Sequence, residues 1–120
     1  NNKQKLSELN ALVHPAVGLD FKSWIAQQNC AYIIKEAAII FEIGAENQYD
    51  KIILITAPLD VRIKRVMARD GSSREQVNSR ITAQLSDNEK AIKADYIINN
   101  TSLTETKKQV ELLHKLILSL

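Results

Sequence analysis

"DKIILITAP", residues 50–58, is the stretch that decides the fold of this 120-residue chain. Ile52–Thr56 is an almost continuous apolar run, typical of a parallel strand that is covered on both faces. Pro58 ends the strand, and residues 59–69 then place apolar side chains at helical spacing. The stretch therefore predicts a buried strand followed directly by a helix.

Two shorter apolar segments predict further strands. Cys30–Ile34 is rich in β-branched and aromatic residues, and "DYIIN" at residues 95–99 is a short apolar run. Because strands alternate with helices along the chain, the sheet is expected to be parallel. We predict an α/β fold with flanking helices, a helical segment at about 60–93 and about three strands, near residues 30–36, 51–56 and 95–98.

Helix boundaries are marked by proline and by capping signals. Leu6, Leu9 and Leu12 recur at helical spacing, and Pro15 is expected to break or restart that helix. A serine followed three residues later by a glutamate is the pattern of a capping box, in which each side chain binds the other residue's backbone N–H. The pattern occurs three times, at Ser72 and Glu75, Ser86 and Glu89, and Ser102 and Glu105.

Composition narrows the function classes. The chain has 16 basic and 14 acidic residues, a balance that argues against non-specific nucleic-acid binding. No apolar run approaches the roughly 20 residues of a membrane span, so no membrane partner is expected. Cys30 is the only cysteine, which excludes an internal disulfide and favours a reducing compartment, the cytoplasm.

A basic stretch follows the decisive strand. In "RIKRVMARDGSSREQVNSRITAQLSDNEK", residues 62–90, Arg62, Arg65 and Arg69 fall on one helix face. A planar guanidinium binds two phosphate oxygens at once, so a phosphate site is one interpretation. A solvated, ion-paired helix face is the other, and it is the interpretation that the residues alone favour for these arginines and for Arg74. RNA binding is disfavoured because no aromatic residue interleaves the arginines to stack on bases.

Other side chains also have two interpretations. Glu36 and Glu42 follow a predicted strand and are either active-site carboxylates or helix-starting residues. Phe21 and Trp24 are expected in the core and not as a base-stacking pair. In parallel sheets the ligand lies beyond the carboxyl ends of the strands, so residues 35–36, 56–60 and 99–100 are the positions where a site is expected.

Four segments together resemble the dephospho-coenzyme A kinase family. They are "LNALVHPAV" (9–17), "EAAIIFEIG" (36–44), the stretch from Ile55 to Lys90, and "ADYIINN" (94–100). The family transfers the γ-phosphoryl group of ATP to the ribose 3′-hydroxyl of dephospho-coenzyme A, in coenzyme A biosynthesis. The resemblance implies an incomplete P-loop kinase-like three-layer fold, with a helical lid at about residues 60–93.

The resemblance also implies the site residues and ligands. Arg65 and Arg69 match arginines that reach from the lid helix toward the ATP phosphates. Asn99 and Asn100 match the loop near the adenine, and His14 matches a position on the acceptor-substrate side. ATP is then the co-substrate, Mg²⁺ accompanies it, and no protein-held metal is expected.

Elements that the family carries before these motifs are missing from the sequence. There is no GxxxxGKS loop, whose backbone amides and lysine hold the β- and γ-phosphates. We therefore expect the C-terminal portion of a kinase, inactive alone, with residues 1–29 belonging to the coenzyme A-side helical region and 30–120 to the kinase core. A non-catalytic nucleotide-binding or regulatory module is the alternative. A sheet without its central strand would expose an edge, which favours association of two copies.

Overall fold

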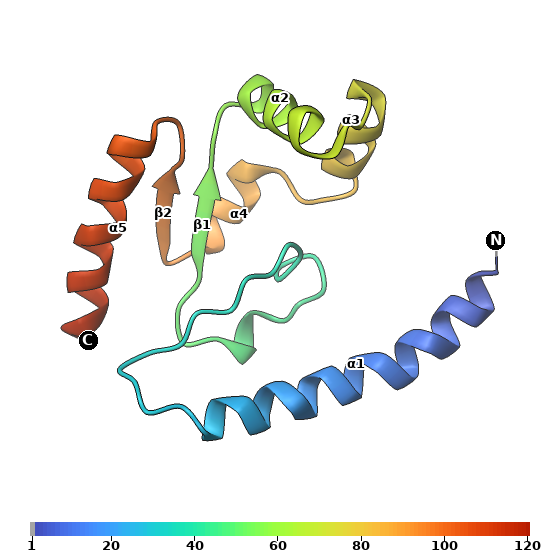
Figure 1. The fold of residues 1–120 in the computed structure, drawn as a ribbon, viewed down its shortest axis with the longest axis horizontal. Helices are drawn as coiled ribbons and strands as arrows, with labels where there is room; N and C mark the ends of the chain where they lie inside the picture. The colour runs from blue at the N-terminus through green and yellow to red at the C-terminus, as the bar shows by residue number, and fades with distance from the viewer. Residues whose placement is uncertain (1) are drawn as a thin grey trace. The chain divides into compact units, whose positions relative to one another are not determined.

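The decisive stretch forms the first of two strands in a parallel sheet. A computed structural model describes residues 2–120 and contains the strands β1 (Ile53–Thr56) and β2 (Tyr96–Asn99). Ile53 lies opposite Tyr96 and Thr56 lies opposite Asn99, so both strands end at the same edge (Figure 1). The expected α/β class with a parallel sheet is confirmed.

The prediction of a third strand is wrong. Residues 30–36 form no strand, and the described sheet has two strands and not about three. A strand requires a hydrogen-bonded neighbour, and the described strands β1 and β2 pair only with each other. Cys30 is exposed and Ile34 keeps 73% of its surface exposed, so this apolar segment is not a buried strand.

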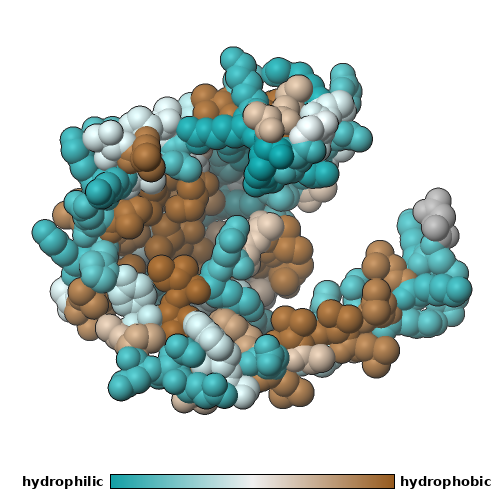
Figure 2. Space-filling model, viewed as in Figure 1, coloured by the Kyte–Doolittle hydropathy of each residue, from teal (hydrophilic) through white to brown (hydrophobic). Residues whose placement is uncertain are grey.

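The chain divides into two compact units, Asn1–Glu36 and Ala37–Leu120. The first unit is mainly α1 (Lys3–Ala26), and its apolar side chains are largely exposed, as Figure 2 shows along this helix. Pro15 does not break α1 as expected but lies inside it. Proline removes one intrahelical hydrogen bond, and the turns on both sides keep the helix continuous.

The second unit contains the sheet and the remaining helices. A single 3₁₀ turn, η1 (Glu46–Gln48), precedes β1, and four α-helices follow: α2 (Leu59–Asp70), α3 (Arg74–Thr82), α4 (Asp87–Lys93) and α5 (Leu103–Leu118). Helix α5 packs along β2, α4 packs against β1, and α2 packs against α3 (Figure 1). Helices α2 to α4 make up the segment expected to be a helical lid. No described helix has both the length and the apolar character to cross a membrane.

Helices α3, α4 and α5 start at serine caps, but two of the three predicted capping boxes differ: one is shifted, and at Ser102 only one of the two reciprocal hydrogen bonds forms. The box predicted at Ser72 is formed instead by Ser73 and Gln76, because α3 begins one residue later, at Arg74. Gly71, with a φ of 67°, ends α2 in the left-handed conformation that favours glycine. The box of Ser86 and Glu89 is confirmed. At α5, the Ser102 side chain accepts a hydrogen bond from the Glu105 backbone N–H.

The core of the second unit is small. Ile63 of α2 and Val77 of α3 are each 2% exposed, and Ile98 of β2 is 5% exposed. Ala45 at 8% and Phe41 and Ile52 at 9% each are the other buried apolar residues of this core. Many other large apolar side chains stay exposed, such as Ile55 at 52% and Ile92 at 87%, so stability depends strongly on these few buried positions.

We expect Ile63→Ala to lower the free energy of unfolding by about 2–4 kcal/mol, because it removes buried methyl groups and leaves a cavity. Ile63→Val should cost about 0.5–1.5 kcal/mol. Urea unfolding followed by circular dichroism measures both. Lys64→Ala, at the exposed neighbouring position, is the control. An equal loss in the control would contradict a core role for Ile63.

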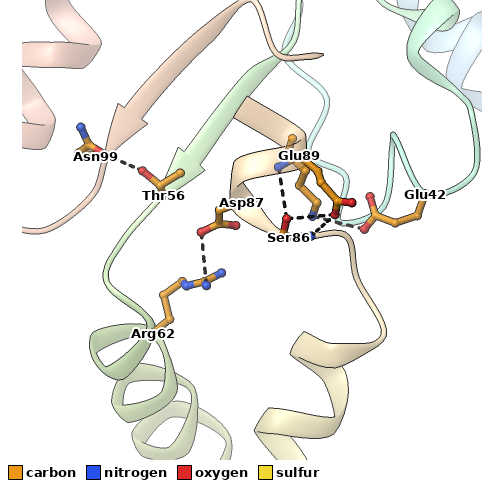
Figure 3. A network of polar contacts seen from close by, with 8 residues as sticks. Glu42, Thr56, Arg62, Ser86, Asp87, Glu89 and Asn99 are labelled. Atoms are coloured by element: carbon orange, nitrogen blue, oxygen red, sulfur yellow. Dashed lines mark hydrogen bonds and ion pairs between the residues drawn. The ribbon is translucent and has the colours of Figure 1, made fainter. Parts of the chain in front are cut away.

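The capping box of α4 predicts a dependence of stability on pH. The Ser86 backbone N–H and hydroxyl both donate to the Glu89 carboxylate at 3.0 Å (Figure 3). These hydrogen bonds, first the backbone one, hold the pKa of Glu89 below its ordinary value of 4.5. Since the folded pKa is the lower one, the stabilisation is complete above the unfolded pKa and is lost as pH falls through the folded pKa.

We therefore expect Glu89→Gln to flatten the pH dependence of unfolding below about pH 4.5, because glutamine keeps hydrogen bonds without titrating. Urea midpoints between pH 7 and pH 3 provide the measurement. Glu111→Gln removes a carboxylate from α5 and controls for charge alone. Equal flattening in that variant would show that the Ser86–Glu89 contact is not the cause.

Candidate functional site

The candidate site lies where the two strands end. The Thr56 hydroxyl donates to Asn99 Oδ1 at 2.7 Å (Figure 3). The Asn100 backbone N–H donates to the Thr56 carbonyl at 2.6 Å. The parallel register places Thr56 beside Asn99, and polar side chains therefore gather at the carboxyl edge of the sheet. This edge is where parallel α/β sheets bind ligands.

The loop after β2 is held by α5. The Asn99 backbone N–H donates to Gln109 Oε1 at 2.9 Å, and Gln109 Nε2 donates to the Asn99 carbonyl at 2.9 Å. The Thr106 hydroxyl donates to Asn100 Oδ1 at 2.9 Å. Sequence reasoning missed both Gln109 and Thr106, which lie after the last segment that resembles the family, at residues 94–100. Their spacing of three residues, on one helix face next to the loop, was the available signal.

Arg65 reaches the same loop from α2. One guanidinium nitrogen donates to the Asn100 carbonyl at 2.6 Å, and the other donates to the Thr101 carbonyl at 2.9 Å. The structure thus brings together Arg65, Asn99 and Asn100, three of the residues predicted for a nucleotide site. Two of the five N–H donors of the guanidinium are used in these bonds, which leaves donors for an anion.

Arg69 lies one turn further along α2 and is paired with the carboxylate of Asp70. Its Nε donates to Asp70 Oδ1 at 2.6 Å, and Arg80 of α3 approaches the other oxygen of Asp70 at 3.5 Å. The hydrogen bond from Arg69 is the main cause that lowers the pKa of Asp70 below its ordinary value of 3.8. The Arg69 side chain is 72% exposed, so an anionic ligand can reach it. A surface pair of this kind is weak enough to be exchanged for a phosphate.

Arg62 and Arg74 make ion pairs, as expected, but the Arg62 side chain is only 33% exposed and is not fully solvated. Arg62 pairs with Asp87 at 3.3 Å, which joins α2 to the start of α4 (Figure 3). Arg74 pairs with Asp60 at 3.1 Å, and both side chains are more than half exposed.

The two glutamates differ in their surroundings. Glu42 pairs with Lys90 at 3.3 Å, and the two side chains are only 13% and 10% exposed. They line a cavity of about 60 Å³ beside Phe41 and β1, room for a water or two. This contact joins the segment before η1 to α4 and is away from the carboxyl edge. Glu36 is exposed in the first unit.

The first unit contains the predicted acceptor-side residue. His14 is exposed on α1. Phe21 and Trp24 stack with ring centroids 6.0 Å apart, and Lys35 lies over the Phe21 ring at 4.6 Å. Trp24 is 45% exposed, so the expectation that this pair is core is wrong within the described unit. Its apolar neighbours on α1 are themselves exposed, and they cannot enclose it.

Metal binding by the protein alone is not supported by its carboxylates. Among residues 2–120, the part that the structure describes, no three His, Cys, Asp or Glu side chains are grouped to hold a metal ion. The cationic groups near the loop after β2 suit an anion. Guanidinium and amide groups of this kind can hydrogen-bond to phosphate oxygens and to nucleobases.

Known proteins with similar sequences and structures fit this chemistry. The sequence model of the family described as dephospho-CoA kinase matches residues 1–105. Proteins named dephospho-CoA kinase are similar to the chain: one from Bacteroides fragilis is 39% identical over 78% of this chain and 46% of its own length. One from Pseudoalteromonas translucida is 38% identical over 96% of this chain and 55% of its own length.

A solved structure has the same fold. The crystal structure of TT1252 from Thermus thermophilus superimposes with a TM-score of 0.85 at 31% identity, covering 96% of this chain and 61% of that one. The chain spans about half the length of the curated relatives it matches. The family model over residues 1–105 and the shared fold show that the chain belongs to the dephospho-CoA kinase family.

Proposed function

We propose that this chain is the C-terminal part of an enzyme that transfers the γ-phosphoryl group of ATP to the ribose 3′-hydroxyl of dephospho-coenzyme A. The observation that carries the proposal is the meeting of Arg65 with the Asn100 and Thr101 carbonyls at the carboxyl edge of the sheet. A guanidinium and two asparagines at this edge suit the phosphates and the base of one nucleotide. Family membership supplies the reaction.

Each predicted residue has a role in this proposal. Asn99 and Asn100 contact the adenine, while Arg65 and Arg69 face the phosphates. His14 contacts the acceptor substrate. Phosphoryl transfer needs positioning and charge neutralisation more than covalent help from the protein, and guanidinium groups supply both. Mg²⁺ is expected to arrive with ATP and to bind its phosphate oxygens, and the enzyme is expected in the cytoplasm.

The 120-residue chain by itself is expected not to turn over ATP, because no GxxxxGK[ST] loop occurs in its sequence. A non-catalytic nucleotide-binding module remains the second candidate. Its site would be the exposed carboxyl edge of the sheet. Affinity of the purified chain alone for ATP would favour this second candidate.

The test is phosphoryl transfer by the full-length protein that carries this chain. ADP release that depends on dephospho-coenzyme A is expected, with no turnover by the 120-residue chain alone. Arg69→Ala should lower kcat by about 10²-fold or more, since a well-placed arginine contributes on that scale or above in phosphoryl transfer. The KM for dephospho-coenzyme A should change far less.

Arg74→Ala is the matched control, because Arg74 is an exposed, ion-paired arginine of the same region. A loss of kcat of similar size in both variants would show that general surface charge is responsible. Turnover by the 120-residue chain would contradict the requirement for a phosphate-binding loop.

We also propose that two copies of the chain associate through the edge of β1. Within the described chain β1 pairs with β2 alone, and Ile55 at its centre is 52% exposed. Unpaired backbone groups beside apolar side chains favour pairing with another strand. Sedimentation at micromolar concentration should give a mass above 13.5 kDa, and Ile55→Lys should lower it. A monomer that unfolds cooperatively would reject this association.

A further inference from the structure

Gln109 makes an unusual contact for a residue of a surface helix. Its carboxamide both accepts from the Asn99 N–H and donates to the Asn99 carbonyl, each at 2.9 Å. This is the pair of bonds that a neighbouring strand would make with the last residue of β2. The same Nε2 also lies 3.2 Å from the Glu105 carbonyl, which fixes the side chain against its own helix. Gln109 is half-buried, so its orientation is restricted.

Arg65 continues the same pattern from another helix. Two nitrogens of its planar guanidinium donate to the next two carbonyls along the chain, those of Asn100 and Thr101. Three consecutive backbone acceptors, from Asn99 to Thr101, are therefore bound by side chains of α5 and α2. The planar fork of arginine restricts both carbonyls at once.

The asparagine side chains are oriented as well. Thr56 donates to Asn99 Oδ1, and Thr106 donates to Asn100 Oδ1. With both oxygens used as acceptors, each side chain keeps its amide NH₂ as the group available to a ligand. Amide donors match the ring nitrogens of a nucleobase, which are acceptors.

We propose that Gln109 is a positioning residue for the nucleotide and that, together with Arg65, it holds the loop after β2 in the conformation that presents the two asparagine amides. This inference rests on the proposed function and adds Gln109, a residue that itself faces neither the phosphates nor the acceptor. It assigns to α5 a role in base binding. Loss of the Gln109 contact should therefore weaken ATP binding without slowing the transfer step.

The first measurement is amide hydrogen exchange on the 120-residue chain without any ligand. Gln109→Met keeps the side-chain length and removes both hydrogen bonds to Asn99. Exchange at Asn99 and Asn100 should become about 10-fold faster, since about 1.4 kcal/mol corresponds to a factor of 10 and one to two hydrogen bonds are lost. Amides of β1 and α2 should not change. Lys107→Met, at an exposed position on the same helix, is the matched control.

The second measurement is steady-state kinetics of the full-length protein. Gln109→Met should raise the KM for ATP about 10-fold, with kcat and the KM for dephospho-coenzyme A within about twofold of wild type. Gln109→Glu retains the acceptor for the Asn99 N–H and should fall between wild type and Gln109→Met. If Gln109→Met does not fold, Gln109→Glu carries the same comparison.

Several results would overturn the inference. Unchanged exchange at Asn99 and Asn100 would show that Gln109 does not hold the loop. Faster exchange throughout β2 and α5 would show general stabilisation only. A fall in kcat with an unchanged KM for ATP would exclude base positioning, and so would equal effects in Lys107→Met.

Failure of the proposed function is a separate result. If the wild-type full-length protein transfers no phosphoryl group to dephospho-coenzyme A, the proposed function is wrong. Amide hydrogen exchange measured with and without ATP then decides whether Gln109 positions the nucleotide. ATP should slow exchange at Asn99 and Asn100 in wild type and not in Gln109→Met. Equal slowing in both proteins, or none in either, would overturn a nucleotide-positioning role for Gln109.

Discussion

The rest of the structure depends on the parallel pairing of β1 with β2. Four residue pairs fix the register, from Ile53 and Tyr96 to Thr56 and Asn99. Because side chains alternate along a strand, a slip of one residue would turn Ile98 away from the core and separate Thr56 from Asn99. The same register also brings the Thr56 carbonyl to the Asn100 N–H. The core and the candidate site are therefore set by one interaction.

The arginines of α2 show how equal charges in a sequence acquire different roles. Arg62 is paired with Asp87, Arg65 binds backbone carbonyls, and Arg69 is paired with Asp70. The first contact joins helices, the second orders a loop, and the third balances an exposed charge. A helical face predicts that three guanidinium groups lie near one another, but their partners decide which one is available to an anion.

The candidate site lies at the surface of a unit whose core is small. Loops that bind ligands lie at the surface, where water competes for the hydrogen bonds of their backbone groups. Here side chains of α5 and α2 bind the backbone of residues 99–101 and supply hydrogen bonds of the kind that a neighbouring strand would make. Ordering of this kind reduces the conformational entropy that a ligand would otherwise have to remove on binding. It explains why α5, whose sequence looked generic, belongs with the site.

The sequence by itself determined the local features of this protein. The apolar run at Ile52–Thr56 determined β1, Gly71 determined the end of α2, and Ser86 with Glu89 determined the start of α4. These features depend on side chains close in sequence, whose chemistry is readable from their spacing. Family resemblance rested on the same stretches.

Only the tertiary structure decided the long-range features. The apolar segment at residues 30–36 looked like a strand, but a strand exists only where another chain segment supplies hydrogen bonds. Similarly, Gln109 carries no motif, and its contact with Asn99 arises because α5 packs along β2. Partners such as Asn100 for Arg65 are 35 residues apart in sequence. Spacing along the chain cannot reveal such contacts, because packing of the helices against the sheet brings the groups together.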